Sequence, residues 1–560
     1  MTLGERLTPR PLLARDAPIA LELTELRSLV RASLPYNRSM SIMQPGVRLA
    51  ELVATLSLGT DLGLGQPMEH VIRQTLIALR MSERLGFDEA ERAVVYYSGL
   101  LGWVGCHTDA YEQAKWFGDD IRIKADGFHV AEPGPRFLLS HLGAGKPFVE
   151  RLRLGLAFIG AARRGDLIDL HSHWLAAKAL TVRLGLGEEV RQSLKESFER
   201  WDGKGLGGAK GEEIRLTSRL VYLADVVAVF HRIGGVDAAI AVAKERNGTH
   251  FDPALVDLFC RQAPALLSDL DAGTNWDAVI AAEPQLERLV PAEQLDDVLE
   301  AIGDFTDIKS PYTIGHSRGV ADLAAEAARI YGLPDDTVVA LRRAGLVHDI
   351  GRLGVSNAIW DKRGALTRAE MERVRLHPYL SERMLSFSPA LAPLGVIAVQ
   401  HHERLDGSGY PRSLSGDALT TAGRILATAD AYHAMTELRP HRPARSSEEA
   451  ASALRAEVTA GHLDGDAVNA VLRAAGHQVR GRRDWPAGLT TREVEVLQLV
   501  ACGYSDKEIA ERLVIARKTA RNHVERIYAK TGVSNRARAG VFAMQHGLMT
   551  AAYLPDRASL

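Results

Sequence analysis

One stretch of the chain, residues 344–411, gathers side chains that could bind metal ions. It contains AGLVHDIGR, RLHPYL and QHHERLDGSGYP, and these segments carry, in predicted helices or at their ends, His348, Asp349, His377, His401 and His402. Imidazole and carboxylate ligands together suit iron, manganese or zinc, and the adjacent His–Asp and His–His pairs let neighbouring metals share ligands. A single histidine of this kind is more often a packed, hydrogen-bonded residue, but the combination predicts a metal centre.

The same segments resemble the HD-GYP family of metal-dependent phosphohydrolases, whose known substrate is cyclic di-GMP. The resemblance covers roughly residues 295–475 and includes HSRGVADLA, LTRAEMERVRLHP and RILATADAYHAMTELRPHR. Position by position, it implies a set of metal ligands, namely His316, His348, Asp349, His377, His401, His402 and Asp430. It also implies two divalent transition metals, iron or manganese, rather than three, because Tyr312 stands where members with a third metal carry Glu.

The expected chemistry is phosphodiester hydrolysis, in which paired metals activate a water and neutralise charge on the phosphoryl oxygens. The resemblance implies that Asp349 bridges the metals and that Arg352 contacts a phosphate, so both are assigned as catalytic. It further implies substrate-binding residues, namely Arg352, Gly409, Tyr410, Pro411, Arg439 and Arg442. The alternative is a plain structural turn formed by Gly407, Gly409, Tyr410 and Pro411. Arg352 stands where the family usually has Lys, and the two cations differ in geometry; Arg352→Lys is therefore expected to raise any phosphodiesterase rate.

Length and composition describe a soluble globular protein with room for about three or four domains. The chain has 560 residues, of which 46% are hydrophobic and 25% charged, and its formal net charge is −2. The cysteines, Cys106, Cys260 and Cys502, form no CxxC pair, which argues against a disulfide framework and a thiolate metal site. The amino terminus lacks the apolar core of a signal peptide, and no apolar run approaches the roughly 20 residues of a membrane span. We therefore expect a cytoplasmic protein with no membrane partner.

An internal repeat relates the first half of the chain to the metal-binding stretch. A shift of 246 residues superimposes LAELVATLSLGTDLG on LDDVLEAIGDFTDIK, places His70 on His316, and sets YSGLLGWVGC against RAGLVHDIGR. Further on, a shift of 204 or 205 residues sets ESFERWDGKGLGG against VQHHERLDGSGYP. Residues 46–264 are therefore interpreted as a degenerate HD-like domain.

This first copy lacks the paired ligands. The residues at the positions of the His–Asp and His–His pairs are Gly102, Trp103, Ser197 and Phe198. Only His70, His173 and Asp225 remain opposite presumed ligands, so we do not expect this copy to bind metal. Aromatic replacements bury large areas, which predicts a former metal cavity filled by side chains. A regulatory ligand pocket is the alternative.

Residues 489–549 change in character and resemble the LuxR-type helix-turn-helix domain almost throughout. The first helix is expected at REVEVLQLVAC, the scaffold helix at DKEIAERL, the recognition helix at ARKTARNHVERIYAKT, and a fourth helix after SNRA. Between residues 516 and 538, seven basic residues stand against Glu525 alone, and such a face attracts phosphates. The residues assigned to DNA binding are Lys518, Thr519, Arg521, Asn522, His523, Arg526, Lys530 and Arg536.

Within this helix Val524 and Ile527 should turn inward, because they lie opposite the basic face. Asn522 and its basic neighbours are expected in the major groove, whereas Lys530 and Arg536 should hold backbone phosphates. One such helix reads a half-site, so the partner is double-stranded promoter DNA bound by a homodimer.

The sequence as a whole predicts an all-α protein: tandem HD-type helical bundles followed by a four-helix LuxR-type helix-turn-helix domain. The expected boundaries are 1–45 for an amino-terminal helix or cap, 46–264 for the degenerate copy, 265–291 for a surface connection, 292–478 for the HD-GYP domain, 479–488 for a linker and 489–550 for the DNA-binding domain. The leading hypothesis is a transcriptional regulator that binds a cyclic dinucleotide, with hydrolysis left open. The alternatives are an enzyme whose main output is cyclic di-GMP hydrolysis, and an inactive sensor or scaffold.

Overall fold

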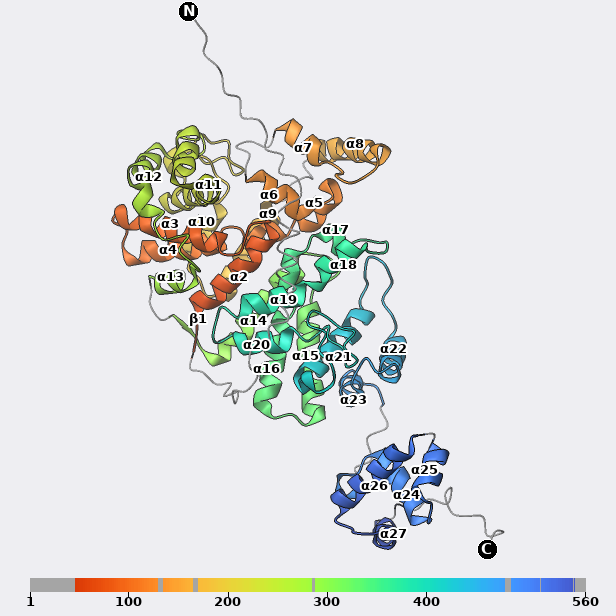
Figure 1. The fold of residues 1–560 in the computed structure, drawn as a ribbon. Coiled ribbons are helices and arrows are strands. Elements are labelled where there is room, and N and C mark those ends of the chain that lie inside the picture. The colour runs from red at the N-terminus through yellow and green to blue at the C-terminus, as the bar shows by residue number, and fades with distance from the viewer. Residues whose placement is uncertain are drawn as a thin grey trace, which may run out of the picture. The chain divides into compact units, whose positions relative to one another are not determined.

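The computed structural model describes residues 46–128, 134–164, 170–284, 288–478, 485–513, 515–546 and 548. Helices dominate these residues (Figure 1), and the two short strands among them, β1 (Val47–Arg48) and β2 (Leu289–Val290), pair antiparallel. The predicted all-α class is confirmed. The amino-terminal helix or cap expected in residues 1–45 and the linker residues 479–484 lie outside the described residues.

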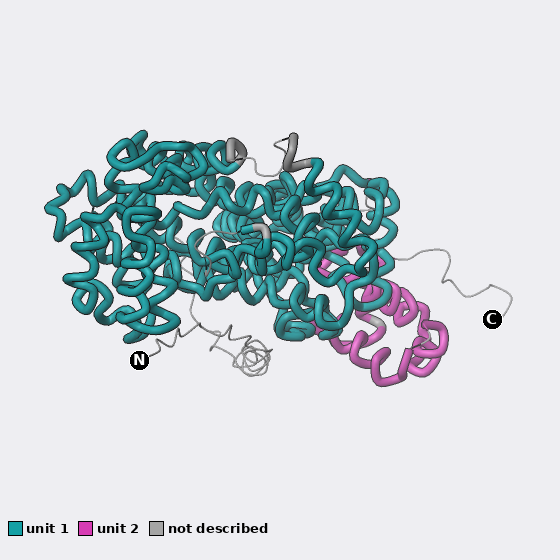
Figure 2. The backbone as a smooth tube through the Cα atoms, turned by 90° about the horizontal axis from the view of Figure 1, so that it is seen from above, with its two compact units in different colours: residues 1–477 teal, residues 478–560 magenta. Residues whose placement is uncertain are grey.

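The chain forms two compact units, residues 1–477 and residues 478–560 (Figure 2). The first unit contains both copies of the repeat. The α-helices of its first copy are α2 (Leu49–Gly63), α3 (His70–Arg84), α4 (Glu89–Leu101), α5 (Ala110–Phe117), α6 (Asp120–Gly127), α7 (Pro135–His141), α8 (Phe148–Arg164), α9 (Leu170–Arg183), α10 (Glu188–Lys195), α11 (Leu216–Glu245) and α12 (Pro253–Leu266).

The second copy has the same kind of helical bundle. Its α-helices are α14 (Ala292–Asp307), α15 (His316–Tyr331), α16 (Asp335–Val347), α17 (Asn357–Trp360), α18 (Arg368–Arg375), α19 (His377–Leu385), α20 (Ala392–Ala398), α21 (Thr421–Thr436), α22 (Ser447–Thr459) and α23 (Gly465–Ala474). A 3-10 helix, η3 (Ile350–Gly354), follows α16. Small residues on α15, such as Ala321 and Ala324, are fully buried, which lets it pack closely against α16, α21 and α23.

The repeat seen in the sequence extends to the backbone. Helices α3 and α15 begin at the equivalent residues His70 and His316, and the residue before each is left-handed, with φ of 73° at Glu69 and 82° at Gly315. Glycine adopts this conformation without strain, whereas Glu does so only when its surroundings hold it. The Glu69 carboxylate accepts a hydrogen bond from the backbone N–H of Asn275 at 2.9 Å, which anchors the strained residue.

The segment between the copies is more than the surface connection expected from its sequence. It contains α13 (Trp276–Ala281), where Trp276 is 5% exposed and Val279 is fully buried. The Tyr96 hydroxyl of the first copy donates to the Val279 carbonyl at 3.1 Å, and β2 pairs with β1 at the start of the described chain. The described part of this segment therefore contributes to the core of the first copy, because it buries the apolar side chains of Trp276 and Val279.

One helix among the described residues, α11, is long and apolar enough to cross a membrane when judged by length and composition. However, 44% of its apolar window is buried inside the protein, and its helical geometry breaks at Gly234 and Gly235. It also carries the buried Asp225. These are properties of the central helix of a folded bundle, and α11 packs against α3, α4 and α12.

The second unit contains α24 (Thr491–Ala501), α25 (Asp506–Leu513), α26 (Arg517–Thr531) and α27 (Arg536–Gln545). Thr490 and Glu493 form a capping box at the start of α24, which satisfies free backbone N–H groups there. Val524 is 7% exposed and Ile527 is 1% exposed, so both turn inward as predicted. The expected four helices are present within a residue or two of their predicted limits.

Candidate metal centre

The predicted ligands come from helix ends that converge in the second copy. His316 starts α15 and His377 starts α19, while Asp430 lies within α21. The His348–Asp349 pair follows α16, and the His401–His402 pair follows α20. Residues far apart in sequence therefore meet because the bundle brings these helix ends together, and together they form clusters able to hold a metal ion.

Asp349 lies at the middle of this arrangement. Its Oδ1 atom is 3.3 Å from His377 Nε2 and 3.6 Å from His401 Nε2. Its Oδ2 atom is 3.8 Å from His316 Nε2 and 3.6 Å from His348 Nε2. Each carboxylate oxygen thus faces a different pair of imidazoles, and this is the geometry that a carboxylate needs to bridge two ions.

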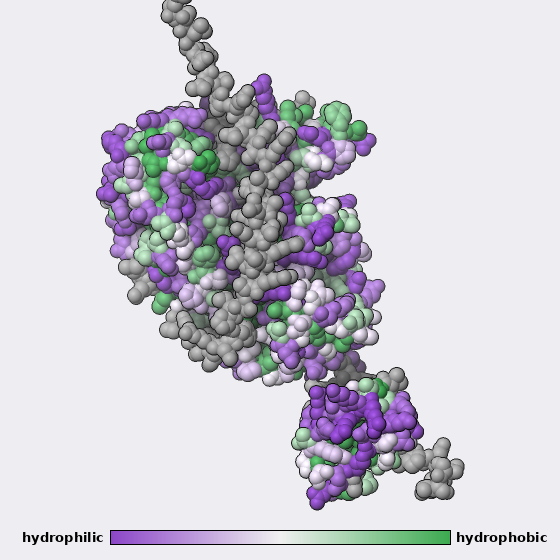
Figure 3. Space-filling view, viewed as in Figure 1, coloured by the Kyte–Doolittle hydropathy of each residue, from purple (hydrophilic) through white to green (hydrophobic). Residues whose placement is uncertain are grey.

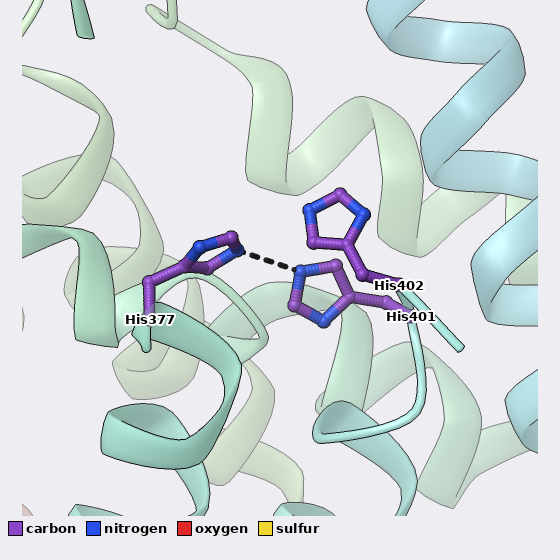
Figure 4. Close-up of side chains that lie close together, drawn as sticks. All are labelled: His377, His401 and His402. Carbon is purple, nitrogen blue, oxygen red and sulfur yellow. Dashed lines mark hydrogen bonds between the residues drawn. The ribbon is translucent and has the colours of Figure 1, made fainter. Parts of the chain in front are cut away.

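Backbone carbonyls orient three of the rings. The Nδ1 atoms of His348, His377 and His401 lie 2.7, 2.6 and 2.6 Å from the carbonyl oxygen three residues earlier. Because a carbonyl only accepts, Nδ1 carries the hydrogen in each ring and Nε2 keeps a free lone pair. The Nε2 atoms of His377 and His401 point at each other 3.0 Å apart beside His402 (Figure 4). Two imidazoles bound side by side to one ion at about 2.1 Å would have such a separation.

The other side of the centre has buried nitrogens that need a partner. The Nε2 atoms of His316 and His348 are buried and make no hydrogen bond to any described residue. Asp430 Oδ1 lies 3.2 Å from the first of these atoms and 3.9 Å from the second, and Asp430 Oδ2 is 3.9 Å from His402 Nδ1. Unpaired buried polar atoms are costly, so the donor set fits a cation on this side as well.

The electrostatics of the cluster favour an ionised Asp349 and neutral imidazoles at His348, His401 and His402. Burial, followed by the neighbouring imidazoles, lowers the pKa of His401 to about 3, and burial also lowers the pKa of His348 and of His402. Burial alone would raise the pKa of Asp349, but the neighbouring cation of Arg352 and the imidazoles hold it well below its usual range. Metal ligands must be in these protonation states.

A cavity of about 240 Å³ opens beside the cluster. Its lining includes the candidate ligands His316, Asp349, His377, His402 and Asp430. The rest of the wall is mostly polar and aromatic, formed by Ser310, Tyr312, Thr313, Arg352, Trp360, Asp361, Tyr410, Ala434, Arg439, Pro440, His441 and Arg442. A ligand in this cavity would meet both halves of the metal centre.

Arg352 connects the centre to the aromatic wall. Its Nη1 atom donates to Asp349 Oδ2 at 3.0 Å, and its guanidinium lies 4.0 Å from the centre of the Trp360 ring. Guanidinium stacks on an aromatic face in a way that ammonium does not. The pocket is therefore shaped around Arg at this position, which changes the expectation that Lys would be the better residue.

In the turn after the His–His pair, Tyr410 faces the cavity, whereas Gly409 and Pro411 have structural positions. Tyr410 lines the cavity, and its ring centre lies 4.8 Å from that of His402. Gly409 instead meets backbone, because a Cβ atom there would lie 2.4 Å from Arg404 N. Pro411 is not part of the cavity lining among the described residues. Of the three residues of this turn predicted to bind substrate, Tyr410 is therefore the one placed to contact a ligand in the cavity.

The two arginines after α21 differ. Arg439 donates to Glu437 Oε2 at 2.5 Å and stays in the cavity wall. Arg442 also lines the cavity, but its guanidinium donates to carbonyl oxygens at the end of α21, including Met435 O at 3.0 Å. The guanidinium N–H groups of Arg442 already cap the carboxyl end of α21, so its contact with a phosphate remains a prediction.

Glu437 is a site residue that our sequence interpretation missed. Its Oε2 atom lies 3.0 Å from His316 Nδ1, and its Oε1 atom lies 3.1 Å from His433 Nδ1. Burial opposes a charge on His316, but Asp430 and Glu437 raise its pKa to about 10, so a metal ion there must displace a proton. The one signal was the spacing of His433 and Glu437, which are four residues apart at the end of α21, where Glu437 directly follows the last helical residue.

The first copy is filled by side chains where the second has its metal centre. Trp103 donates from Nε1 to Asp225 Oδ1 at 3.2 Å, and its ring packs against Phe198 at 5.7 Å. His70 Nε2 lies 3.1 Å from Asp225, whereas His173 pairs with Asp109 instead. The cavity left beside Trp103 has a volume of about 20 Å³, enough for a single water. Among the described residues, no group of three candidate metal ligands occurs here.

The second unit exposes most of the predicted DNA-binding face. On α26 the side chains of Lys518, Thr519, Arg521, Asn522 and Arg526 are exposed, and His523 is half-buried. Figure 3 shows hydrophilic residues covering much of the visible surface of this unit.

Two of the predicted phosphate contacts already have partners inside this unit. Lys530 Nζ lies 2.7 Å from the buried Glu493, and Arg536 pairs with Asp506. Their phosphate roles remain predictions, because an existing ion pair competes with a phosphate.

Two family models match the chain. One, described as an HD domain, matches residues 300–467. The other, described as bacterial regulatory proteins of the luxR family, matches residues 487–543. The first covers the metal centre and its cavity, and the second covers α24 to α26 and most of α27.

Similar proteins extend this result to the first copy. A 3′3′-cGAMP-specific phosphodiesterase 3 of Vibrio cholerae is 34% identical over 426 residues, which is 73% of this chain and 91% of that protein. The chain belongs to the HD-GYP family of metal-dependent phosphohydrolases. A crystal structure of a cyclic GMP-AMP specific phosphodiesterase of V. cholerae matches this HD-GYP protein with a TM-score of 0.54 and 28% identity, covering 78% of this chain and 99% of that one. A cyclic di-GMP phosphodiesterase of Pseudomonas aeruginosa is 37% identical over 166 residues, covering 30% of this chain and 40% of that protein.

The HD-GYP assignment made from sequence motifs is thus confirmed, and so is the luxR-family unit. The structure brings all the predicted ligands of the HD-GYP copy into one cluster beside a cavity. The metal dependence of the family agrees with this donor set.

Proposed function

We propose that this HD-GYP protein hydrolyses a cyclic dinucleotide and that the bound or hydrolysed state of this ligand controls how its luxR-family unit engages promoter DNA. The observation that carries the proposal is the position of Asp349, whose two carboxylate oxygens face separate histidine pairs beside the cavity. The proposed cofactors are two divalent transition metals, iron or manganese. The proposed location is the cytoplasm.

The chain's own groups have distinct tasks in this proposal. When bound, a metal pair activates a water and neutralises charge on the phosphoryl oxygens. His348, His377 and His401 would hold the ions through Nε2, because their Nδ1–H groups are bonded to backbone carbonyls. Arg352 and Arg439 offer guanidinium donors to the phosphate oxygens from the cavity wall. Tyr410 offers a ring face on which a base can stack.

The first substrate to test is 3′3′-cGAMP. A V. cholerae phosphodiesterase specific for this nucleotide aligns with both copies of the repeat, whereas the cyclic di-GMP phosphodiesterase of P. aeruginosa aligns over 166 residues. Cyclic di-GMP is the second candidate, and it shares the same phosphodiester chemistry. A discriminating assay supplies each nucleotide to the purified chain with Fe²⁺ or Mn²⁺ under anaerobic conditions and separates the linear products.

The matched control for hydrolysis is Asp349→Asn, which keeps the shape of the side chain and removes its charge. We expect the parent to open at least one nucleotide and the variant to be slower by at least about 100-fold, since the bridging carboxylate belongs to both halves of the centre. If the parent binds both metals and opens neither nucleotide, the protein is a sensor or scaffold rather than an enzyme.

The regulatory half of the proposal rests on the luxR-family unit. Its exposed helix α26 presents Asn522 and its basic neighbours to a major groove, and a homodimer on a two-fold operator would place two such helices in successive grooves. The test is a titration of labelled promoter fragments with and without the nucleotide. An affinity that is independent of the nucleotide would leave hydrolysis as the main output, which is the alternative function.

A further inference from the structure

A buried ion pair joins the first copy of the repeat to the second copy. Lys309, two residues after the end of α14, is 3% exposed, and Asp120, at the start of α6, is fully buried. The Lys309 Nζ atom lies 3.3 Å from Asp120 Oδ2 and donates to the Val355 carbonyl at 2.7 Å. The carboxylate of one copy thus neutralises a cation of the other in a place without solvent.

The same carboxylate caps a helix of the second copy. Asp120 Oδ1 accepts a hydrogen bond from Ser356 Oγ at 2.7 Å and another from the Asn357 backbone N–H at 2.8 Å. Ser356 and Asn357 begin α17, the single-turn helix that ends at Trp360. Every oxygen of Asp120 is therefore used to hold a segment that belongs to the other copy.

From there, hydrogen bonds lead directly into the cavity wall. Asn357 Nδ2 donates to Lys309 O at 2.6 Å and to Asp361 Oδ2 at 3.0 Å. Asp361 Oδ1 in turn accepts from Ser310 Oγ at 2.8 Å. Ser310, Asp361 and Trp360 all line the cavity.

The last link is the stack of Trp360 on Arg352, the cation that pairs with Asp349. The contacts run without a gap from α6 of the first copy to the carboxylate at the middle of the metal centre. A buried ion pair is a weak source of net stability, because desolvation opposes it, but it can specify one arrangement of the groups around it.

We infer that Asp120 is a positioning residue for the nucleotide cavity, and that the first copy has this role in place of metal binding. The inference rests on the proposed function of the cavity as a cyclic dinucleotide site. The Asp120 carboxylate of the first copy fixes the position of the cavity wall that carries Trp360 and Asp361. Trp360 in turn fixes the orientation of the Arg352 guanidinium. Loss of the Asp120 charge should therefore weaken nucleotide binding while the metal ligands stay in place.

The first copy also offers a matched control. Asp252 is 5% exposed, lies 2.5 Å from Arg219, and caps α12 by accepting from the Ala254 N–H. It thus resembles Asp120 in burial, ion pairing and helix capping, but its partners belong to the first copy alone. Asp120→Asn and Asp252→Asn make the same chemical change with and without a link to the cavity.

The test compares both variants with the parent in the full-length protein. We expect Asp120→Asn to raise the KM for the hydrolysed nucleotide by about tenfold, since small displacements of positioned groups have effects of this size or larger. Metal content should equal that of the parent, and Asp252→Asn should keep the parent's KM. A KM unchanged by Asp120→Asn, or raised equally by both variants, would overturn the inference.

A second readout needs no substrate. Amide hydrogen exchange in residues 355–361 should be faster in Asp120→Asn than in the parent and in Asp252→Asn, because the Asn357 N–H is held by Asp120. If the parent hydrolyses no cyclic dinucleotide, the proposed function fails, and this exchange experiment still decides whether Asp120 positions the wall. Equal exchange in all three proteins would refute the positioning role.

Discussion

Replacing Arg352 with Lys tests how the cavity wall and the metal centre work together. The guanidinium lies 4.0 Å from the centre of the Trp360 ring and donates to Asp349 at 3.0 Å. Lys keeps the positive charge near the carboxylate, but its ammonium loses the flat stack on Trp360 and the forked geometry that suits a phosphate. The sequence alone suggested that Lys would be the faster residue, and these contacts predict the opposite.

The size of the effect follows from the stack. A cation over an aromatic face contributes about 0.5–1 kcal/mol when exposed and about 2 kcal/mol when desolvated. Arg352 is largely shielded, with 15% of its side chain exposed. A loss of about 1–2 kcal/mol in transition-state stabilisation corresponds to a fall in kcat/KM of about 5- to 30-fold.

A double-mutant cycle separates two effects of Arg352→Lys on the rate: the loss of the stack on Trp360 and the loss of the forked guanidinium geometry. Initial rates of cyclic dinucleotide hydrolysis are measured for the parent, Arg352→Lys, Trp360→Leu and the double variant, with metal content determined for each. In the Trp360→Leu background the Lys exchange should cost less, by about 1 kcal/mol, because the stack is already absent. A Lys variant as fast as the parent, or a Lys effect that does not depend on residue 360, would refute this reasoning.

Three further outcomes are expected. Asp349→Ala should reduce bound metal from about two ions per chain to fewer than one by elemental analysis, whereas His70→Ala should leave metal content unchanged; equal losses would refute the assignment to the second copy. Asn522→Ala should cost roughly 1–3 kcal/mol on the preferred operator and little on random DNA in salt titrations, so equal losses on both would leave α26 as a phosphate-binding surface. Burial disfavours a charged imidazole at His173, but Asp109 raises its pKa to about 10, so this pair stabilises the fold below pH 6.5 and loses its effect as the pH rises through 10. Denaturant unfolding between pH 7 and 9 should show a loss of up to about 2 kcal/mol that is absent in His173→Gln, and an identical pH dependence in that variant would contradict the assignment.

The sequence by itself determined the class of the protein and most of the candidate ligands. Helical periodicity, capping residues and the spacing of His–Asp and His–His pairs are local properties, and local properties are readable from one chain. The recognition helix was readable for the same reason, since Val524 and Ile527 recur on one face while the basic residues recur on the other. The filled first cavity also followed from residue types, because Trp103 and Phe198 stand at the positions of the polar ligands Asp349 and His402 and are larger and apolar.

Only the tertiary structure decided which groups face one another. The motif predicts that Asp349 is a bridging carboxylate, but the division of its two oxygens between separate histidine pairs depends on where α15, α19 and α20 converge. The stack of Trp360 on Arg352 leads to a prediction for Arg352→Lys that is opposite to the one drawn from residue type. Sequence spacing carries no information on such contacts, because each requires loops to fold back over distances that no local pattern encodes.

The link from Asp120 to Lys309 is the clearest case. The two residues are 189 positions apart, and each alone reads as an ordinary surface charge. Charged side chains are rarely buried unless they are paired, so their burial is intelligible only once both copies are packed together. The sequence shows that four of the seven presumed ligand positions differ in the first copy. Only the tertiary structure shows that a buried carboxylate of this copy pairs with Lys309 and bonds to Ser356 and Asn357 of the other copy, because a buried carboxylate must find its cation in three dimensions.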